Sequence, residues 1–427
     1  MSISLATLPH EVLGEILEFL PITEFTRLSA VSKGLHNILE DENLWRQRCY
    51  KEFNISLTQT FRKVKWKTLY KALNNPSVYT WGEASRGRLG RDPENYSHNS
   101  KPMVVEEMNG KGVAQIVCGG WSMTTLTKKG EVWTWGTMNA EATLTSNPDD
   151  YDQEELGNAP ASYARMMRIG PTTINETPIQ VETLKGKNVK SIASGRAHCL
   201  ALTDRGEVYQ WRSVTKLQKI DLPEDTRIIQ IAAGWTHSLA LSKDGDIFSW
   251  QSDSPSIISR GTVPDPAENE KYVIIGGGEY FTIGLTNYGK VYKSEDPNDL
   301  SKLSLFNGAV GRKFTHISAA FRRFAAFNES GEVAIWEDTG NEEKYDELQH
   351  RQVNQVTFGD WHCGALTDDG ELYTWGQPSG GALGHNESFQ VVKQPTLVQE
   401  LQGQYVFNIA FAGWHSAALV VPLNSDA

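Results

Sequence analysis

A stretch of sequence that recurs along the chain sets the strongest limit on the fold. In its clearest copy, residues 228–250, a short apolar strand leads to Gly234, after which Leu239 and Leu241 alternate with smaller residues. Alternation with a period of two is typical of a strand whose two faces differ. Gly245 then indicates a turn, and the β-branched and aromatic residues behind it predict a returning strand.

Seven copies of this stretch align on one reference position. A large apolar residue stands four positions later in every copy, and a glycine stands eight positions later in the first six copies. That glycine indicates a turn with a positive φ, and a type I turn closed by a glycine bulge is favoured because the residue before it varies. The reference residues are Ser122, His198, His237, Phe281, Arg323, His362 and His415, at spacings of 76, 39, 44, 42, 39 and 53 residues.

The two ends of the repeat region complete one another. The seventh copy lacks its returning strand, and a lone copy of that strand, SVYTWG at 77–82, stands before the first complete unit. If this strand joins the last unit, the repeats form a closed ring without an open sheet edge. Repeats of roughly 40 to 50 residues with short strands are typical of propellers. The sequence therefore predicts an all-β, seven-bladed propeller over residues 76–427.

The repeats resemble those of the regulator of chromosome condensation family. The segments GGWSMTTLTKKGEVWTWG, AAGWTHSLALSKDG and GDWHCGALTDDGELYTWG support the likeness, as do GRLG (87–90) and GALG (381–384), which Pro102 and Pro395 follow. The nearest alternative is a WD-repeat propeller, but strands of that family end in Trp-Asp, and the strands of this chain do not. The resemblance covers residues 76–422.

Residues 1–53 predict a separate, small all-α domain. Its first apolar stripe is too wide for a helix with one buried face, so part of the stripe must meet another surface. Pro21 is expected to end the first helix. The stripe consists of Val12, Leu13, Ile16, Leu17, Phe19 and Leu20. A second helix is expected through Leu28, Val31 and Leu35, and a third segment has Leu44 and Trp45. So short a domain forms only a marginal core by itself, which favours a partner.

The string LPHEVLGEILEFLPITEFTRLSAVSKGLHNILEDENLWRQR closely resembles an F-box. Leu-Pro, the Ile-Leu-x-Phe-Leu run, the Arg-Leu-x-x-Val-Ser-Lys segment and the late Leu-Trp match in order. The resemblance implies docking on the Skp-type adaptor of a cullin ubiquitin ligase. The alternative, that the apolar residues only fill a three-helix core, is weakened by the width of the stripe. The expected adaptor-binding residues are Leu8, Pro9, Val12, Leu13, Ile16, Leu17, Leu20, Leu44 and Trp45.

Two further segments stand apart from these patterns. Residues 54–75 predict a helical linker that holds the propeller at a fixed angle, because Trp66, Leu69, Tyr70 and Leu73 recur at helical spacing. Residues 137–177 interrupt the repeat rhythm with an acidic stretch that has few large apolar residues. This loop is either a binding loop or flexible filler, and both alternatives stay open.

Charge and composition exclude several classes of partner. The formal net charge of the 427-residue chain is −11, with +2 in residues 1–75 and −13 in the propeller. Because affinity for nucleic acid rests mostly on neutralising phosphates, the acidic ring is not expected to bind it. No apolar run approaches the ~20 residues that span a bilayer, and the first residues do not read as a signal peptide. We therefore expect no membrane partner and a cytoplasmic or nuclear location, or both.

No pattern in the chain indicates catalysis. Four histidines share the reference position on different blades, without the close pairing of a zinc site, so each is expected to hydrogen-bond a neighbouring strand. No phosphate loop, nucleophile elbow or metalloprotease motif occurs. The four cysteines, Cys49, Cys118, Cys199 and Cys363, lack CxxC spacing and are expected to be free structural thiols. We expect no catalytic residue, no metal and no cofactor, and so no enzyme.

Together the two resemblances favour a substrate-recognition subunit of a Skp–cullin–F-box ubiquitin ligase. The F-box would bind the adaptor and, through it, a cullin, while the propeller would bind the protein to be ubiquitinated for degradation. The alternatives are a guanine-nucleotide exchange factor for a small GTPase, which the propeller family implies, and a scaffold that acts outside any ligase.

The bends just before the reference positions are the candidate substrate site. A ring places them at equivalent points, so a collar of aromatic residues is expected on one face, although such residues also suit packing between blades. Arg196, Glu279 and Arg322 break the repeat pattern and, with the 137–177 loop, are expected to govern which substrate binds. The candidate substrate-binding residues are Trp121, Arg196, Trp235, Glu279, Tyr280, Phe321, Arg322, Trp361 and Trp414.

Overall fold

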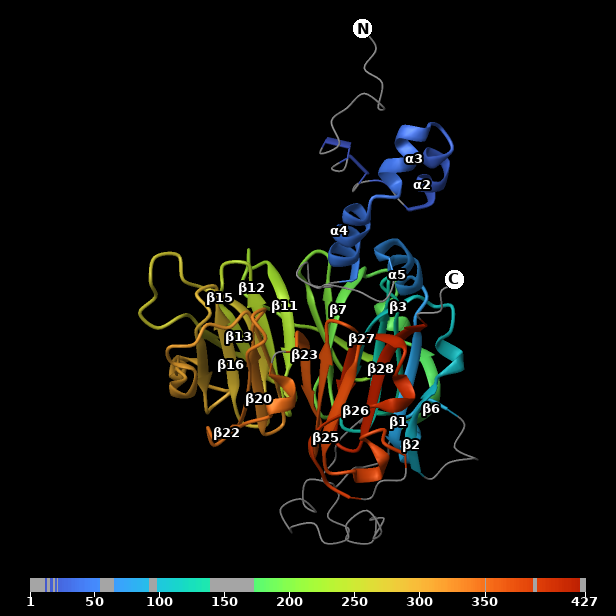
Figure 1. The fold of residues 1–427 in the computed structure, drawn as a ribbon. Coiled ribbons are helices and arrows are strands. Elements are labelled where there is room, and N and C mark those ends of the chain that lie inside the picture. The colour runs from blue at the N-terminus through green and yellow to red at the C-terminus, as the bar shows by residue number, and fades with distance from the viewer. Residues whose placement is uncertain are drawn as a thin grey trace.

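The chain folds into a small helical domain seated on one end of a β-propeller (Figure 1). The computed structural model describes residues 12–13, 16–17, 20, 22–53, 65–91, 98–138, 173–349, 351–386 and 390–422. Both parts of the predicted fold class, the all-α N-terminal domain and the all-β propeller of seven blades, are confirmed.

The propeller consists of seven four-stranded antiparallel sheets, and the first six blades each take four consecutive strands. Blade 1 contains β3 (Val113–Cys118), β4 (Ser122–Thr127), β5 (Val132–Met138) and β6 (Thr173–Gln180). Blade 2 contains β7 (Val189–Ser194), β8 (Cys199–Thr203), β9 (Val208–Ser213) and β10 (Lys216–Lys219). Blade 3 contains β11 (Ile228–Ala233), β12 (His237–Ser242), β13 (Ile247–Gln251) and β14 (Ser254–Gly261).

The next three blades repeat this order. Blade 4 contains β15 (Tyr272–Gly277), β16 (Thr282–Thr286), β17 (Val291–Ser294) and β18 (Ser304–Leu305). Blade 5 contains β19 (His316–Ala320), β20 (Arg323–Phe327), β21 (Val333–Glu337) and β22 (Glu342–Glu343). Blade 6 contains β23 (Val353–Phe358), β24 (His362–Thr367), β25 (Leu372–Gly376) and β26 (Val392–Leu397).

Blade 7 joins the two ends of the repeat region. It contains β27 (Gln404–Phe411), β28 (His415–Pro422), β1 (Ser77–Glu83) and β2 (His98–Val104). Val78 pairs with Leu419 across the junction, and the blue β1 lies beside the red β28 in Figure 1. The fully buried Trp81 donates its indole N–H to the Ala382 carbonyl of blade 6, at 2.8 Å. The predicted ring closure by residues 77–82 is therefore confirmed.

The reference position and its glycines have the predicted local roles. All six glycines eight positions after it have a positive φ, between 75° and 96°. The turns are tight, since the Gly245 N–H donates to the Ser242 carbonyl at 3.1 Å. The ring of His237 covers Gly234 so closely that an added Cβ would lie 2.1 Å from its Cε1 atom. Only a glycine fits beneath a ring at this bend.

The predicted hydrogen bonds of the buried histidines to a neighbouring strand are present in two blades. His362 Nε2 lies 2.8 Å from Ser416 Oγ on β28, and His237 Nε2 lies 3.4 Å from Thr282 Oγ1 on β16. In both cases the partner belongs to the next blade. The histidines therefore join adjacent blades near the propeller axis, where space is smallest.

The described helices of the N-terminal domain are short and share one core. They are α2 (Ile22–Ser29), α3 (Lys33–Leu39) and α4 (Glu42–Phe53). The prediction of one helix through Leu28, Val31 and Leu35 is wrong. The chain breaks between α2 and α3, where the Ser32 hydroxyl accepts from the Leu35 N–H and caps α3.

The predicted linker helix is present as α5 (Trp66–Leu73). Its buried face packs in the same apolar cluster as α3 and α4, and that cluster also includes Tyr405 and Val421 of blade 7. Lys128 of blade 1 reinforces the contact, with Nζ 2.8 Å from Asn74 Oδ1 and 3.5 Å from the ring centre of Phe53. One hydrophobic core thus continues from the helical domain into the propeller.

Candidate functional site

The helical domain and the bends lie at opposite ends of the propeller. Strand β28 begins directly after the bend residue Trp414, and near its other end Val421 packs against the helical cluster. The second strand of every blade runs in the same direction, so all bends lie on the face away from the helices. Figure 1 shows the helices at the other end of the propeller. We call this surface the bend face.

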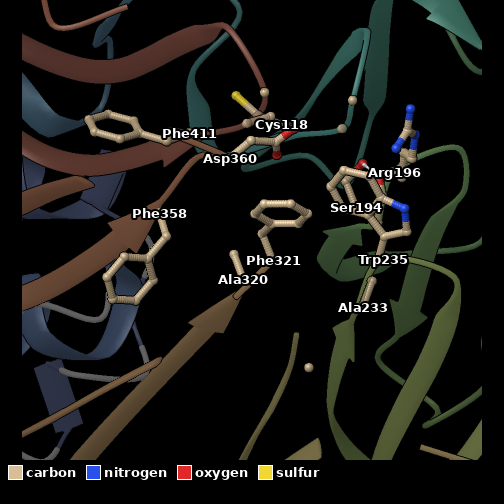
Figure 2. A pocket seen from close by; sticks show the side chains of 17 residues that line it. Cys118, Ser194, Arg196, Ala233, Trp235, Ala320, Phe321, Phe358, Asp360 and Phe411 are labelled. Atoms are coloured by element: carbon tan, nitrogen blue, oxygen red, sulfur yellow. Dashed lines mark hydrogen bonds between the residues drawn. The ribbon is translucent and has the colours of Figure 1, made fainter. Parts of the chain in front are cut away.

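The bends of all seven blades meet around an open hollow (Figure 2). Its lining includes one or more residues from every blade, among them Gly119, Gly195, Gly234, Gly277, Phe321, Asp360 and Gly413. Backbone hydrogen bonds link neighbouring bends: Gly120 N–H donates to the Arg196 carbonyl at 2.8 Å, and Arg196 N–H donates to the Trp235 carbonyl at 3.2 Å. This chain of bonds fixes the bends rigidly around the hollow.

Aromatic rings and one guanidinium form a continuous stack beside the hollow. The guanidinium carbon of Arg196 lies 4.7 Å from the ring centre of Trp121 and 4.3 Å from that of Trp235. Trp235 then contacts Phe321 at 4.7 Å between ring centres, and Phe321 contacts Trp361 at 6.4 Å. Figure 2 shows Arg196, Trp235 and Phe321 around the opening. Cation–π contacts with two indole rings hold Arg196 in place.

A charged pair joins the bends of blades 4 and 5. Arg322 Nε lies 2.9 Å from Glu279 Oε2, with the Glu279 side chain buried and the Arg322 side chain 56% exposed. The neighbouring Tyr280 is half exposed, and burial of its hydroxyl, followed by a hydrogen bond with Glu279, raises its pKa. Glu279 and Arg322, the two charged residues that depart from the repeat pattern here, thus form an ion pair with one another.

The structure brings the predicted bend residues to one face, but they differ in exposure. Tyr280 and Trp361 are 51% and 38% exposed, whereas Trp121, Glu279 and Phe321 are buried. The Trp414 ring packs over the buried Arg88 guanidinium at 5.6 Å. Packing between blades therefore accounts for part of the collar, and the exposed aromatic surface is concentrated at Tyr280 and Trp361.

Sequence reasoning missed Asp360, a nearly buried carboxylate that lines the hollow in Figure 2. It stands two residues before the reference position of blade 6, as Arg196, Trp235, Glu279 and Phe321 do in their own blades. That alignment is the signal by which it could have been found. The bounds expected for the 137–177 loop are corrected at both ends, because β5 extends to Met138 and β6 begins at Thr173. Residues 139–172 lie outside the described residues.

The adaptor-binding set predicted for the helical domain divides into two groups. Leu13, Leu17, Leu44 and Trp45 are at most 8% exposed and pack in the domain's own core. Their assignment as adaptor-binding residues stays a prediction, and their burial shows that in this structure they contribute mainly to the domain's own core. Leu20 is partly buried against the same core. Leu8 and Pro9 lie outside the described residues.

Val12 and Ile16 form the other group. They are 41% and 36% exposed, while Leu13 and Leu17, next to them in sequence, are 1% exposed. Val12 and Ile16 are four residues apart, as are Leu13 and Leu17. On a helix each pair lies along one edge, so one apolar edge faces the core and the other faces solvent. This is the division that the width of the stripe predicts.

The titratable side chains of the described residues give no sign of a metal site. Among them, no three His, Cys, Asp or Glu side chains are grouped to bind an ion. Burial lowers the pKa of His198 and His362 to about 3 and that of His237 to about 4, so these side chains are neutral near pH 7. Within the same part of the chain, no helix has the length and apolar character needed to cross a membrane.

The fold defines a seven-bladed propeller protein with a small helical domain at its N-terminal end. The F-box-like family model matches residues 5–51. Two models of the regulator of chromosome condensation (RCC1) repeat match residues 77–126 and 369–419, and residues 228–250 and 353–381. The chain thus has an F-box-like domain followed by RCC1 repeats that form the seven-bladed propeller.

Relatives of this chain have varied functions. The E3 ubiquitin-protein ligase HERC2 of Mus musculus is 26% identical over 82% of the chain, but the chain spans only 7% of that protein. The ultraviolet-B receptor UVR8 of Arabidopsis thaliana is 24% identical, over 83% of the chain and 72% of the receptor. The solved structure of Prp20p from Saccharomyces cerevisiae matches with a TM-score of 0.62 and 18% identity, covering 89% of the chain and 95% of Prp20p. At that identity the likeness concerns the fold alone.

Proposed function

We propose that this protein is the substrate-recognition subunit of a Skp–cullin–F-box ubiquitin ligase, acting in the cytoplasm or the nucleus. The F-box-like domain binds the Skp-type adaptor and, through it, a cullin. The propeller binds the protein to be ubiquitinated for degradation, and ubiquitin transfer takes place on other subunits. In this proposal the chain itself is not catalytic.

The exposure of Val12 and Ile16 is the main observation in favour of this proposal. Apolar side chains that a small domain leaves in solvent, beside neighbours that it buries, are typical of a docking surface. The continuous core between α5 and blade 7 adds support, because a receptor must hold its substrate at a defined position relative to the adaptor. The bend face, at the opposite end of β28, is then free for a substrate while the adaptor is bound.

Co-purification tests the adaptor contact. The Val12→Glu/Ile16→Glu variant should lose Skp-type adaptor and cullin, because two charges would have to be buried in an apolar contact. Val310→Glu is the matched control, since Val310 is an exposed valine of the propeller. Retention of the adaptor by the double variant, or its loss from the control, would contradict the proposed docking.

Nucleotide exchange on a small GTPase is the second candidate. Its support is the fold shared with Prp20p, whose structural description includes binding to Gsp1p and histones. Release of labelled nucleotide from a panel of small GTPases distinguishes the two functions, because a ligase receptor should not accelerate it. A scaffold outside any ligase would bind the adaptor without the cullin.

A further inference from the structure

The bend face is uneven, and its exposed aromatic surface lies over blades 4 to 6. Tyr280 and Trp361 are the exposed large aromatic side chains there, and Trp361 contacts Phe321, which lines the hollow. Aromatic side chains that are part exposed beside an opening can anchor a side chain of a partner by stacking.

The charges inside the hollow largely cancel. Arg196 and Asp360 both line it and have opposite signs. Glu279 and Arg322 neutralise one another through their ion pair. Because the rings of both Trp121 and Trp235 contact the Arg196 guanidinium, its positive charge is held beside two aromatic rings. The hollow alone therefore favours neither a cationic nor an anionic partner.

The loops beside the hollow decide whether the bend face attracts positive or negative partners. Each of these loops joins the third and fourth strands of a blade. In blades 3 and 5 the loop is bonded to the bend: Ser252 N–H donates to the Thr236 carbonyl, and Asp338 N–H to the Arg322 carbonyl, both at 2.8 Å. Across blades 3 to 5 these loops contain Asp253, Glu295, Asp296, Asp299 and Asp338, and Glu337 is the last residue of β21, directly before the loop of blade 5. We call these six residues the acidic rim.

Part of the acidic rim is balanced and part is not. Lys293 pairs with Glu295, and Lys302 pairs with Asp296 and Asp299. Asp253, Glu337 and Asp338, by contrast, form no ion pair within the described chain, although the hydrogen bond with Glu279 and then the nearby charge of Asp338 raise the pKa of Arg322. These three carboxylates give the aromatic side of the bend face a local negative charge. A segment with acidic or phosphorylated residues would be repelled there, whereas one with basic residues would be attracted.

We propose that the bend face over blades 3 to 6 binds an extended, basic segment of the protein that the receptor selects. Lysine or arginine side chains of that segment stack on Tyr280 and Trp361 and face Asp253, Glu337 and Asp338. Its role in substrate choice rests on the receptor function proposed above. The surface itself is defined by the geometry and charge of the propeller alone.

Fluorescence anisotropy with the full chain tests this surface. The probe is a fluorescein-labelled peptide of alternating arginine and serine, with a glutamate–serine peptide as its counterpart. Asp253→Asn/Glu337→Gln/Asp338→Asn should weaken binding of the arginine peptide roughly ten-fold. Trp361→Ala should weaken it about three-fold through lost cation–π contact. Both variants change side chains with exposed surface, so the fold should persist.

The matched control is Asp221→Asn/Glu224→Gln/Asp225→Asn. These exposed acids lie on blade 2, at the helical end of the propeller, and the net charge changes by the same amount. The control should bind the arginine peptide as the unaltered chain does. Equal weakening by both triple variants, absence of binding, or preference for the glutamate peptide would each overturn the proposal.

Adaptor co-purification from the same samples separates the two proposals. If the adaptor is bound but the bend-face variants bind peptide normally, the basic-segment proposal fails and the receptor function stands. If the adaptor is never bound but the peptide effects are as expected, the receptor function fails while the binding surface is supported.

Discussion

Arg322 and Glu279 form an ion pair across two neighbouring blades, with Nε and Oε2 2.9 Å apart. The arginine is more than half exposed, but the carboxylate beneath it is buried. The pair therefore joins the bends of blades 4 and 5 and offsets the charge of the buried Glu279 carboxylate. The buried Glu279 needs a cation to offset its charge, whereas the exposed Arg322 is also solvated by water.

Removing the arginine alone should destabilise the protein. Arg322→Ala leaves a buried carboxylate without its cation, so we expect a loss of about 1–2 kcal/mol in the free energy of unfolding. Glu279→Gln/Arg322→Ala should recover most of that loss, because the buried group is then neutral. Chemical denaturation measures both variants. Equal stability of the single and double variants would contradict the coupling.

Ring closure should be essential to a monomeric, soluble propeller. Deletion of residues 77–82 removes β1 and exposes the edge of β28, so the protein should aggregate. Trp81→Ala keeps the strand and should leave a soluble protein that is about 3–5 kcal/mol less stable. Size-exclusion chromatography and thermal denaturation distinguish the two outcomes. A monomeric deletion variant with an unchanged Tm would show that the closure is dispensable.

Acid should weaken the propeller through its buried histidines. Burial holds the pKa of His362 at about 3, whereas an unfolded histidine titrates near 6.5. The unfolded chain therefore binds more protons, and stability falls as the pH drops from about 6.5 toward 3. At pH 5 this one histidine should cost about 2 kcal/mol relative to neutral pH.

His362→Phe isolates this effect, because Phe281 occupies the same position in blade 4. Between pH 7 and pH 5 the free energy of unfolding should fall less in the variant than in the unaltered chain, by about 2 kcal/mol, the amount expected for one histidine. Urea denaturation at both pH values gives the comparison. Identical pH dependence of the two proteins would exclude His362 as a source of acid sensitivity.

The contact between the helical domain and the propeller should depend on Lys128. Lys128→Ala removes its hydrogen bond to Asn74 and its cation–π contact with Phe53. We expect a loss of about 1 kcal/mol and faster hydrogen exchange in α5. Lys129→Ala, at the next exposed lysine, is the control and should leave exchange in α5 unchanged. Identical exchange in both variants would mean that the apolar cluster alone holds the domains together.

The sequence by itself determined the architecture of the propeller. The glycines eight positions after the reference residues indicate turns with positive φ, and a lone strand at 77–82 matches the strand missing from the last repeat. Both are local patterns, and the glycine is recognisable because it recurs in six of the seven copies. The same reasoning found the bends, and it found α5 from its helical spacing. It failed at Ser32, where a single capping residue divides the expected helix.

Only the tertiary structure decided which side chains are available to partners. Val12 and Leu13 are adjacent and both apolar, but packing against residues far along the chain buries one and exposes the other. The pairing of Arg322 with Glu279, the stacking of Arg196 and the core shared by Tyr70 and Tyr405 likewise join residues from distant segments. A repeat pattern specifies each blade, whereas contacts between blades depend on how the closed ring places them.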